Sequence, residues 1–166
     1  AEMYAVPTTP ETQGKTEEII GTWLKQAGNR KKVMVATKIT GPSPRFAHIR
    51  DNLGFSKPAL DDAIEKSLKR LQTDYVDLYQ LHWPERTTNM FGQRGYTHNP
   101  DEQWDDNMLD VLNNLNGLIQ SGKIRYWGLS NETPWGIMRM LHLAEVNGLP
   151  KPISVQNPYS LLNRTF

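Results

Sequence analysis

Short runs rich in β-branched and aromatic residues alternate along this chain with longer amphipathic segments, and this alternation limits the fold more than any other feature. Strands are predicted over residues 33–38, 76–82, 124–131 and 153–157. A helix is predicted before the first strand and in each interval that follows. This order requires a parallel sheet with right-handed crossovers, so the sequence predicts an α/β fold.

Two of the predicted helices show how their apolar sides are recognised. In the helix over 16–27, Thr16 is placed to cap the first turn, and the apolar residues at helical spacing are Ile19, Ile20, Trp23, Leu24 and Ala27. The second helix is opened by Ser56 and Pro58, and its stripe is Leu60, Ala63, Ile64, Ser67, Leu68 and Leu71. We expect both stripes to pack on the core.

Two parallel architectures fit this order, a doubly wound open sheet and a (β/α)8 barrel. The open dinucleotide-binding sheet carries Gly-x-Gly-x-x-Gly after its first strand, whereas the first strand here ends in Thr37-Lys38. A closed eight-stranded barrel takes roughly 250 residues, and this chain has 166. We therefore predict an incomplete (β/α)8 TIM barrel with about four parallel strands and four helices.

Composition argues against several classes of function. Lys and Arg number 19 and Asp and Glu 18, so the net charge of +1 gives no electrostatic basis for binding nucleic acid. No apolar run approaches the roughly 20 residues that span a bilayer, and residues 1–18 are too polar for a signal peptide. The chain has no cysteine, and no two histidines have a metal-ligand spacing. We expect a cytoplasmic protein without metal, membrane or nucleic-acid partners.

Polar side chains occupy the end of every predicted strand. Lys38 ends the first, Gln80 and His82 the second, Ser130-Asn131 the third and Gln156 the fourth. Each has an ordinary structural explanation, such as a solvated lysine, a histidine bonded to a carbonyl, a turn or a strand edge. In a barrel, however, chemistry sits at the carboxyl ends of the strands. Their recurrence at equivalent ends therefore predicts an active site.

Five motifs in order resemble the aldo-keto reductases, and the bacterial Tas-type reductases in particular. They are AEMY at 1–4, ATK at 36–38, DLYQLHWP at 77–84, GKIRYWGLSN at 122–131 and VQNPYSLL at 155–162. The resemblance covers essentially residues 1–166. It implies a partial barrel domain, from the end of the second βα unit through the sixth strand, that reduces aldehyde or ketone substrates with NADPH.

The resemblance also implies roles for individual residues. Tyr4, Lys38 and His82 match three members of the family's catalytic tetrad, and Tyr4 would be the proton donor. The position of the fourth member, an aspartate, falls before Ala1. Ser130, Asn131 and Gln156 resemble the residues that hold the nicotinamide carboxamide.

The loop over about 83–106 follows the strand that carries His82, so we expect it at the mouth of the site. Trp83, Met90, Phe91 and Tyr96 would form a substrate wall or lid, with Trp83 in the wall; the alternative is a plain surface excursion. Two other functions remain open. The chain could be a non-enzymatic cofactor-binding regulatory module, or an inactive truncated fragment of a reductase.

Overall fold

A computed structural model describes residues 1–91 and 95–164. Four parallel strands form one sheet in the order β1-β2-β3-β4. They are β1 (Ala36–Ile39), β2 (Val76–Leu81), β3 (Ile124–Ser130) and β4 (Val155–Gln156). The helices are α1 (Lys15–Ala27), α2 (Lys57–Leu71), α3 (Met108–Gln120) and α4 (Pro134–Val146). The alternation predicted from the sequence is therefore present.

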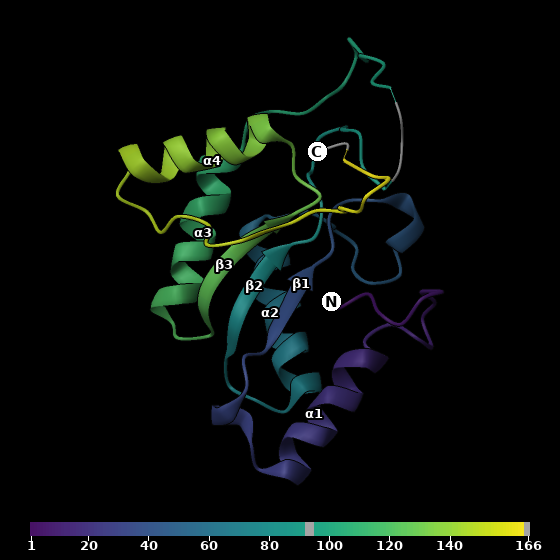
Figure 1. Cartoon of the computed structure of the whole chain (residues 1–166), viewed down its shortest axis with the longest axis vertical. Coiled ribbons are helices and arrows are strands. Elements are labelled where there is room, and N and C mark those ends of the chain that lie inside the picture. Colours follow the sequence, from purple (N-terminus) through teal and green to yellow (C-terminus); the bar gives the residue numbers. More distant parts are fainter. Residues whose placement is uncertain (92–94, 165–166) are drawn as a thin grey trace.

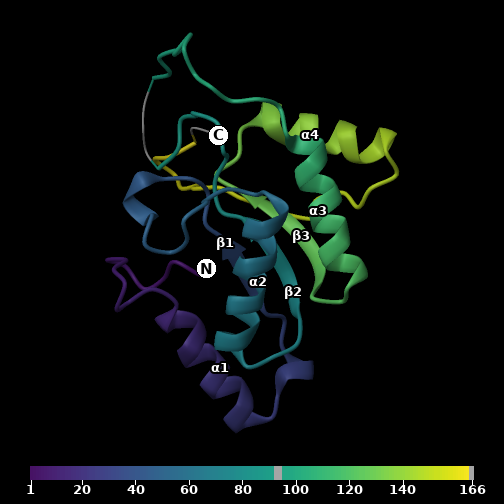
Figure 2. The ribbon, with the colours of Figure 1, turned by 180° about the vertical axis from the view of Figure 1, so that it is seen from behind.

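Helices α2 and α3 lie behind the sheet in Figure 1 and in front of it in Figure 2, so they cover one face. The face toward the viewer in Figure 1 carries no helix. A doubly wound sheet has helices on both faces and a reversal of strand order, and this sheet shows neither feature. Consecutive strands with helices on one side are the arrangement of a (β/α)8 barrel, here incomplete, as predicted.

The main core lies between the sheet and the helices that cover it. All six residues of the predicted stripe of α2 are buried. From the sheet, Ile39, Tyr79, Leu81, Trp127 and Leu129 belong to the same core cluster. Ser56 caps α2 by accepting a hydrogen bond from the Ala59 amide. This layer fixes the strands and thereby the positions of the residues at their carboxyl ends.

The predicted inward face of α1 was wrong in part. Leu24 is buried as predicted, but Ile19 and Trp23 are 70% and 49% exposed, and the other buried residues are Glu17 and Gly21. Gly21 lies so close to the backbone at the end of α2 that a Cβ placed there would stand 2.2 Å from the Arg70 carbonyl oxygen. Because two helices approach most closely where a side chain is missing, the glycine face became the contact.

Three smaller expectations also need correction. Helix α1 is capped by Gly14 in a left-handed conformation, with no side-chain hydrogen bond, rather than by Thr16. Strand β1 covers 36–39 instead of 33–38. Strand β4 covers 155–156 instead of 153–157, although Ile153 and Ser154 also make backbone hydrogen bonds to β3. Strand pairing depends on the neighbouring strand, which local sequence does not specify.

Candidate active site

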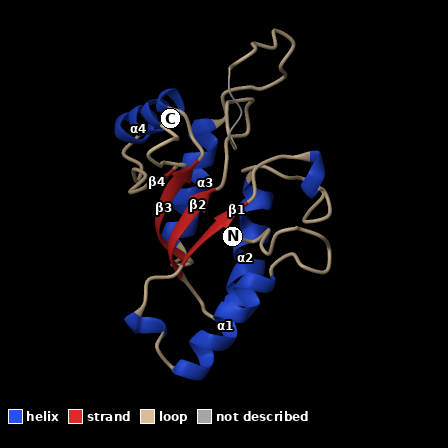
Figure 3. Cartoon of the chain, turned by 45° about the vertical axis from the view of Figure 1, so that its right-hand side comes forward, coloured by secondary structure: helices blue, strands red, loops and turns tan. Residues whose placement is uncertain are grey.

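The carboxyl ends of the strands meet at one edge of the sheet, where the loops after β1 and β2 and the amino-terminal segment gather (Figure 3). Lys38 is paired in register with Gln80, which is paired with Gly128. Successive side chains of a strand point to opposite faces. Tyr79 belongs to the helix-covered core, so Lys38, Gln80 and His82 share the face without helices.

Tyr4 comes to this edge from outside the regular elements. Its ring meets the ring of His82 edge-on, with centroids 5.7 Å apart and planes at 84°. The two side chains line an open pocket of about 790 Å³ together with Trp83. The structure thus brings together Tyr4 and His82, which stand 78 positions apart in the sequence (82 − 4).

The site is electrostatically positive and partly shielded from water. Burial and then the positive charge of Lys38 lower the pKa of His82 to about 3, so its imidazole is neutral near pH 7. The His82 Nδ1 atom is buried without a hydrogen-bond partner among residues 1–91 and 95–164. Burial also lowers the pKa of the Lys38 ammonium. Within the same residues, no carboxylate lies within 4.0 Å of the Lys38 amine.

Ser130, Asn131 and Gln156 form a second polar group next to this pocket. The Ser130 hydroxyl donates to the Gln156 carbonyl oxygen at 2.9 Å, and the Asn131 backbone amide donates to the same oxygen at 3.1 Å. The Asn131 side chain donates from Nδ2 to the His82 carbonyl oxygen at 2.9 Å. It also donates to the Ser130 hydroxyl at 3.1 Å. These bonds connect the ends of β2, β3 and β4.

The pocket wall is largely aromatic. Trp83 is 4% exposed, and its indole donates to the Pro42 carbonyl oxygen at 3.1 Å. Its ring lies 5.7 Å from Phe46 and 5.5 Å from Phe91. Met90 lines the same pocket. Three of the four proposed wall residues therefore surround the Tyr4 pocket.

The fourth proposed wall residue, Tyr96, lines an adjoining pocket of about 810 Å³ between the 83–106 loop and the start of α4. Arg86 and Glu132 form an ion pair beside this pocket, with side chains only 10% and 4% exposed. Arg86 also donates to the Thr133 hydroxyl at 2.9 Å. The ion pair fastens the loop to the amino-terminal end of α4.

Two features of this region were missed from the sequence. Phe46 lies in a short 3-10 helix, Pro44–Phe46, between β1 and α2 and gave no periodic signal, yet it packs on Trp83. Glu2 stands next to Met3 and Tyr4 in an amino-terminal segment that has no regular structure, yet it is 1% exposed. Its partner Arg50 lies far along the chain, and only the folded structure brings the two charges together.

Two further observations concern the described part of the chain. None of its helices is long and apolar enough to cross a membrane. None of its groups of histidine, aspartate and glutamate residues has an arrangement that could hold a metal ion.

Parallel strands wound with helices on one face, and polar residues gathered at their carboxyl ends, define a barrel protein of the (β/α)8 type. The model of the aldo/keto reductase family matches residues 1–166. Protein tas of Escherichia coli strain K12 is 49% identical to this chain over an alignment 172 positions long. The alignment covers 100% of this chain and 48% of that protein.

Two more relatives agree. An aldo-keto reductase of Babesia bovis is 42% identical over 80% of this chain and 49% of its own length. The crystal structure of a thermostable aldo-keto reductase with the inhibitor epalrestat superposes with a TM-score of 0.65 and 25% identity, covering 91% of this chain and 43% of that one. The chain belongs to the aldo/keto reductase family, and it spans about half the length of these relatives.

Proposed function

We propose that this chain supplies part of the active site of an oxidoreductase that reduces aldehyde or ketone carbonyls with NADPH. The domain would extend from the end of the second βα unit of the barrel through the sixth strand. The observation that carries the proposal is the edge-on contact between Tyr4 and His82 in one pocket, with the Lys38 charge near enough to lower the pKa of His82. Family membership supports the same reaction class.

The cofactor supplies the hydride, and the protein has to hold the carbonyl and deliver a proton to its oxygen. Negative charge develops on that oxygen in the transition state, and donors aimed at it give the largest stabilisation. The Tyr4 hydroxyl is the proposed proton donor. Because His82 is neutral, it keeps one ring N–H that donates to the same oxygen. Lys38 adds positive charge next to His82 at the carboxyl end of β1.

The residues proposed for the nicotinamide carboxamide have free hydrogen-bonding capacity. Asn131 uses its Nδ2 group for two bonds inside the protein, which leaves the Oδ1 atom as an acceptor. The Gln156 side chain is exposed, and its backbone carbonyl makes the bonds to Ser130 and Asn131. The Asn131 Oδ1 acceptor and the Gln156 side-chain amide lie at the same edge of the sheet. Together they match the nicotinamide carboxamide, which has both a donor and an acceptor. Trp83 would form the wall against which the substrate packs.

The first test is binding of NADPH to the purified protein, followed by nicotinamide fluorescence, and then turnover of a panel of aldehydes and ketones. Tyr4→Phe removes one oxygen atom and is expected to lower kcat by about 10²- to 10⁴-fold with NADPH binding unchanged. Tyr75→Phe is the matched control, because Tyr75 is a partly buried tyrosine at the opposite end of β2. Equal kcat values for the two variants would refute Tyr4 as the donor. Binding without turnover in the unmutated protein would favour the regulatory alternative.

A further inference from the structure

Glu2 is a buried carboxylate that stands two residues before Tyr4, and it is bonded to Lys38 and to Thr40, which directly follows β1. Its backbone amide donates to the Lys38 carbonyl oxygen at 3.1 Å. Its side-chain Oε1 accepts from the Thr40 backbone amide at 2.7 Å. Gln13 donates from Nε2 to the Glu2 carbonyl oxygen at 2.8 Å. Residue 2 therefore lies against the carboxyl end of the strand that carries Lys38.

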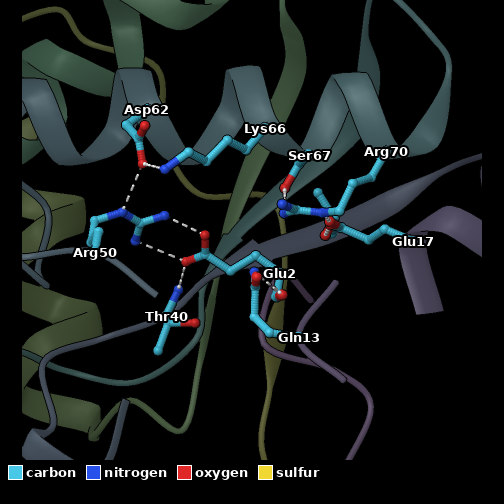
Figure 4. A network of polar contacts seen from close by, with 10 residues as sticks. Glu2, Gln13, Glu17, Thr40, Arg50, Asp62, Lys66, Ser67 and Arg70 are labelled. Atoms are coloured by element: carbon cyan, nitrogen blue, oxygen red, sulfur yellow. Dashed lines mark hydrogen bonds and ion pairs between the residues drawn. The ribbon is translucent and has the colours of Figure 1, made fainter. Parts of the chain in front are cut away.

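Arg50 closes the network from the side of the loop after β1 (Figure 4). Its Nη1 donates to Glu2 Oε1 at 3.0 Å, and its Nη2 bonds Glu2 Oε2. The Nε atom donates to Asp62 Oδ2 at 3.2 Å, and Lys66 pairs with the same oxygen at 2.9 Å. The arginine side chain is 6% exposed. Asp62 of α2 therefore fixes the Arg50 side chain, and Arg50 in turn fixes the Glu2 carboxylate.

We propose that Glu2 is a positioning residue that sets the Tyr4 hydroxyl relative to Lys38 and His82, with Arg50 as its support. The inference rests on the proposed reductase function. In the described part of the chain, the Tyr4 backbone bonds to Ala1 and to Thr16 in α1, and makes no backbone hydrogen bond to β1. The hydrogen bonds of Glu2 are therefore the contacts that fix the position of Tyr4 relative to β1.

The chemistry of the site requires a carboxylate. Three N–H groups point at the two Glu2 oxygens, one from Thr40 and two from Arg50. A carboxylate accepts all of them, whereas a glutamine has one acceptor oxygen and would turn an NH2 group toward a donor. Glu2→Gln keeps the side-chain volume and breaks part of this clamp, which makes it a suitable probe.

Glu17, in α1, offers a matched control because it contacts the same strand, β1. It is 1% exposed, pairs with Arg70 at 2.7 Å and accepts a hydrogen bond from the Thr37 hydroxyl (Figure 4). Thr37 alternates with Lys38 and points to the helix-covered face. Glu17→Gln therefore disturbs an equally buried carboxylate, its arginine partner and its β1 contact, and leaves all the Glu2 bonds in place.

The experiment compares Glu2→Gln and Glu17→Gln in the purified protein. Both are expected to lose stability to a similar extent in urea. Only Glu2→Gln is expected to lower kcat, on the order of 100-fold, because a displacement of about 1 Å costs that much. Its Kd for NADPH should not change, since Ser130, Asn131 and Gln156 lie outside the network. A folded Glu2→Gln variant with an unchanged kcat overturns the inference, and so does an equal loss of kcat in Glu17→Gln.

If Glu2→Gln does not fold, Arg50→Lys tests the same connection. It keeps a positive charge beside Glu2 but cannot bond both Glu2 oxygens and Asp62 at once. A fall in kcat at constant Kd for NADPH supports the inference, and an unchanged kcat overturns it.

A structural readout separates failure of this inference from failure of the proposed function. If the unmutated protein reduces no carbonyl, the proposed function fails. The position of Tyr4 is then measured by nuclear Overhauser contacts between its ring protons and those of His82. Loss of these contacts in Glu2→Gln and their retention in Glu17→Gln supports the positioning role. Their retention in Glu2→Gln overturns it.

Discussion

Two helical glycines are expected to respond in opposite ways to the same substitution. Glycine in a helix interior is less stable than alanine by roughly 0.5–1 kcal/mol, because it loses more backbone entropy on folding. Gly117 lies on the exposed side of α3, and a Cβ there would meet nothing within 4 Å. Gly117→Ala should therefore raise the free energy of unfolding by about 0.5–1 kcal/mol.

Gly21 in α1 has the same propensity gain but no space for a side chain. A Cβ would stand 2.2 Å from the Arg70 carbonyl oxygen and 2.7 and 2.8 Å from the Leu71 carbonyl carbon and Cα. These are backbone atoms of α2, so no rotamer change relieves the clash, and the two helices must separate. Overpacking of this kind costs about 1–3 kcal/mol. Separation would also strain the Glu17–Arg70 ion pair.

We therefore expect Gly21→Ala to lower the free energy of unfolding by about 1 kcal/mol once the propensity gain is subtracted. The free energies of unfolding of the two variants should then differ by about 2 kcal/mol, as measured by urea unfolding followed by far-ultraviolet circular dichroism. Equal denaturant slopes would show that the compactness of the unfolded state is unchanged. If Gly21→Ala is as stabilising as Gly117→Ala, the close contact between α1 and α2 is refuted.

Three other perturbations test the site and its surroundings. Burial holds the pKa of His82 at about 3 against 6.5 for the free side chain, so between these values the unfolded state binds the extra proton. Stability should then fall as pH falls, by up to about 1.4 kcal/mol per unit, and the difference from His82→Asn between pH 7 and pH 4 isolates this effect. A difference that does not vary with pH contradicts it. Gly41→Ala places a Cβ 2.4 Å from Trp83 Nε1. It should cost about 1–3 kcal/mol and raise the KM for substrate, and an unchanged KM would argue against Trp83 as the wall. Arg86→Ala leaves Glu132 buried without its partner and should cost about 3–5 kcal/mol, whereas the double replacement Arg86→Met with Glu132→Leu should recover much of this loss. If the double variant is no more stable than Arg86→Ala, the Arg86–Glu132 pair contributes stability beyond neutralising a buried charge.

The sequence predicted the elements well where one segment determines its own structure. The stripe of α2 is fully buried because it alternates cleanly with charged residues. The same reasoning gave the wrong face of α1, because Gly21 has no side chain to appear in an apolar pattern and yet defines the contact. Periodicity reports which side chains are apolar, and it does not report where two backbones can approach.

The active site was predicted from the alternation of strands and helices along the chain. Parallel strands end at the same edge of a sheet, so Lys38, His82, Ser130 and Gln156 had to lie near one another once the βα alternation was recognised. The edge-on contact of His82 with Tyr4, and its low pKa, could not be predicted in this way. Both depend on how an irregular segment packs on the sheet and how much water it excludes.

The sequence by itself determined the order of the elements, the α/β class and the polar residues at the strand ends, because these follow from local patterns and from the geometry of parallel strands. Only the tertiary structure decided which face of α1 packs, that Phe46 joins the pocket wall, and that Glu2 joins Arg50 and β1. The reason is that such contacts join residues far apart in the chain. Their energies depend on distances and burial that exist only after folding.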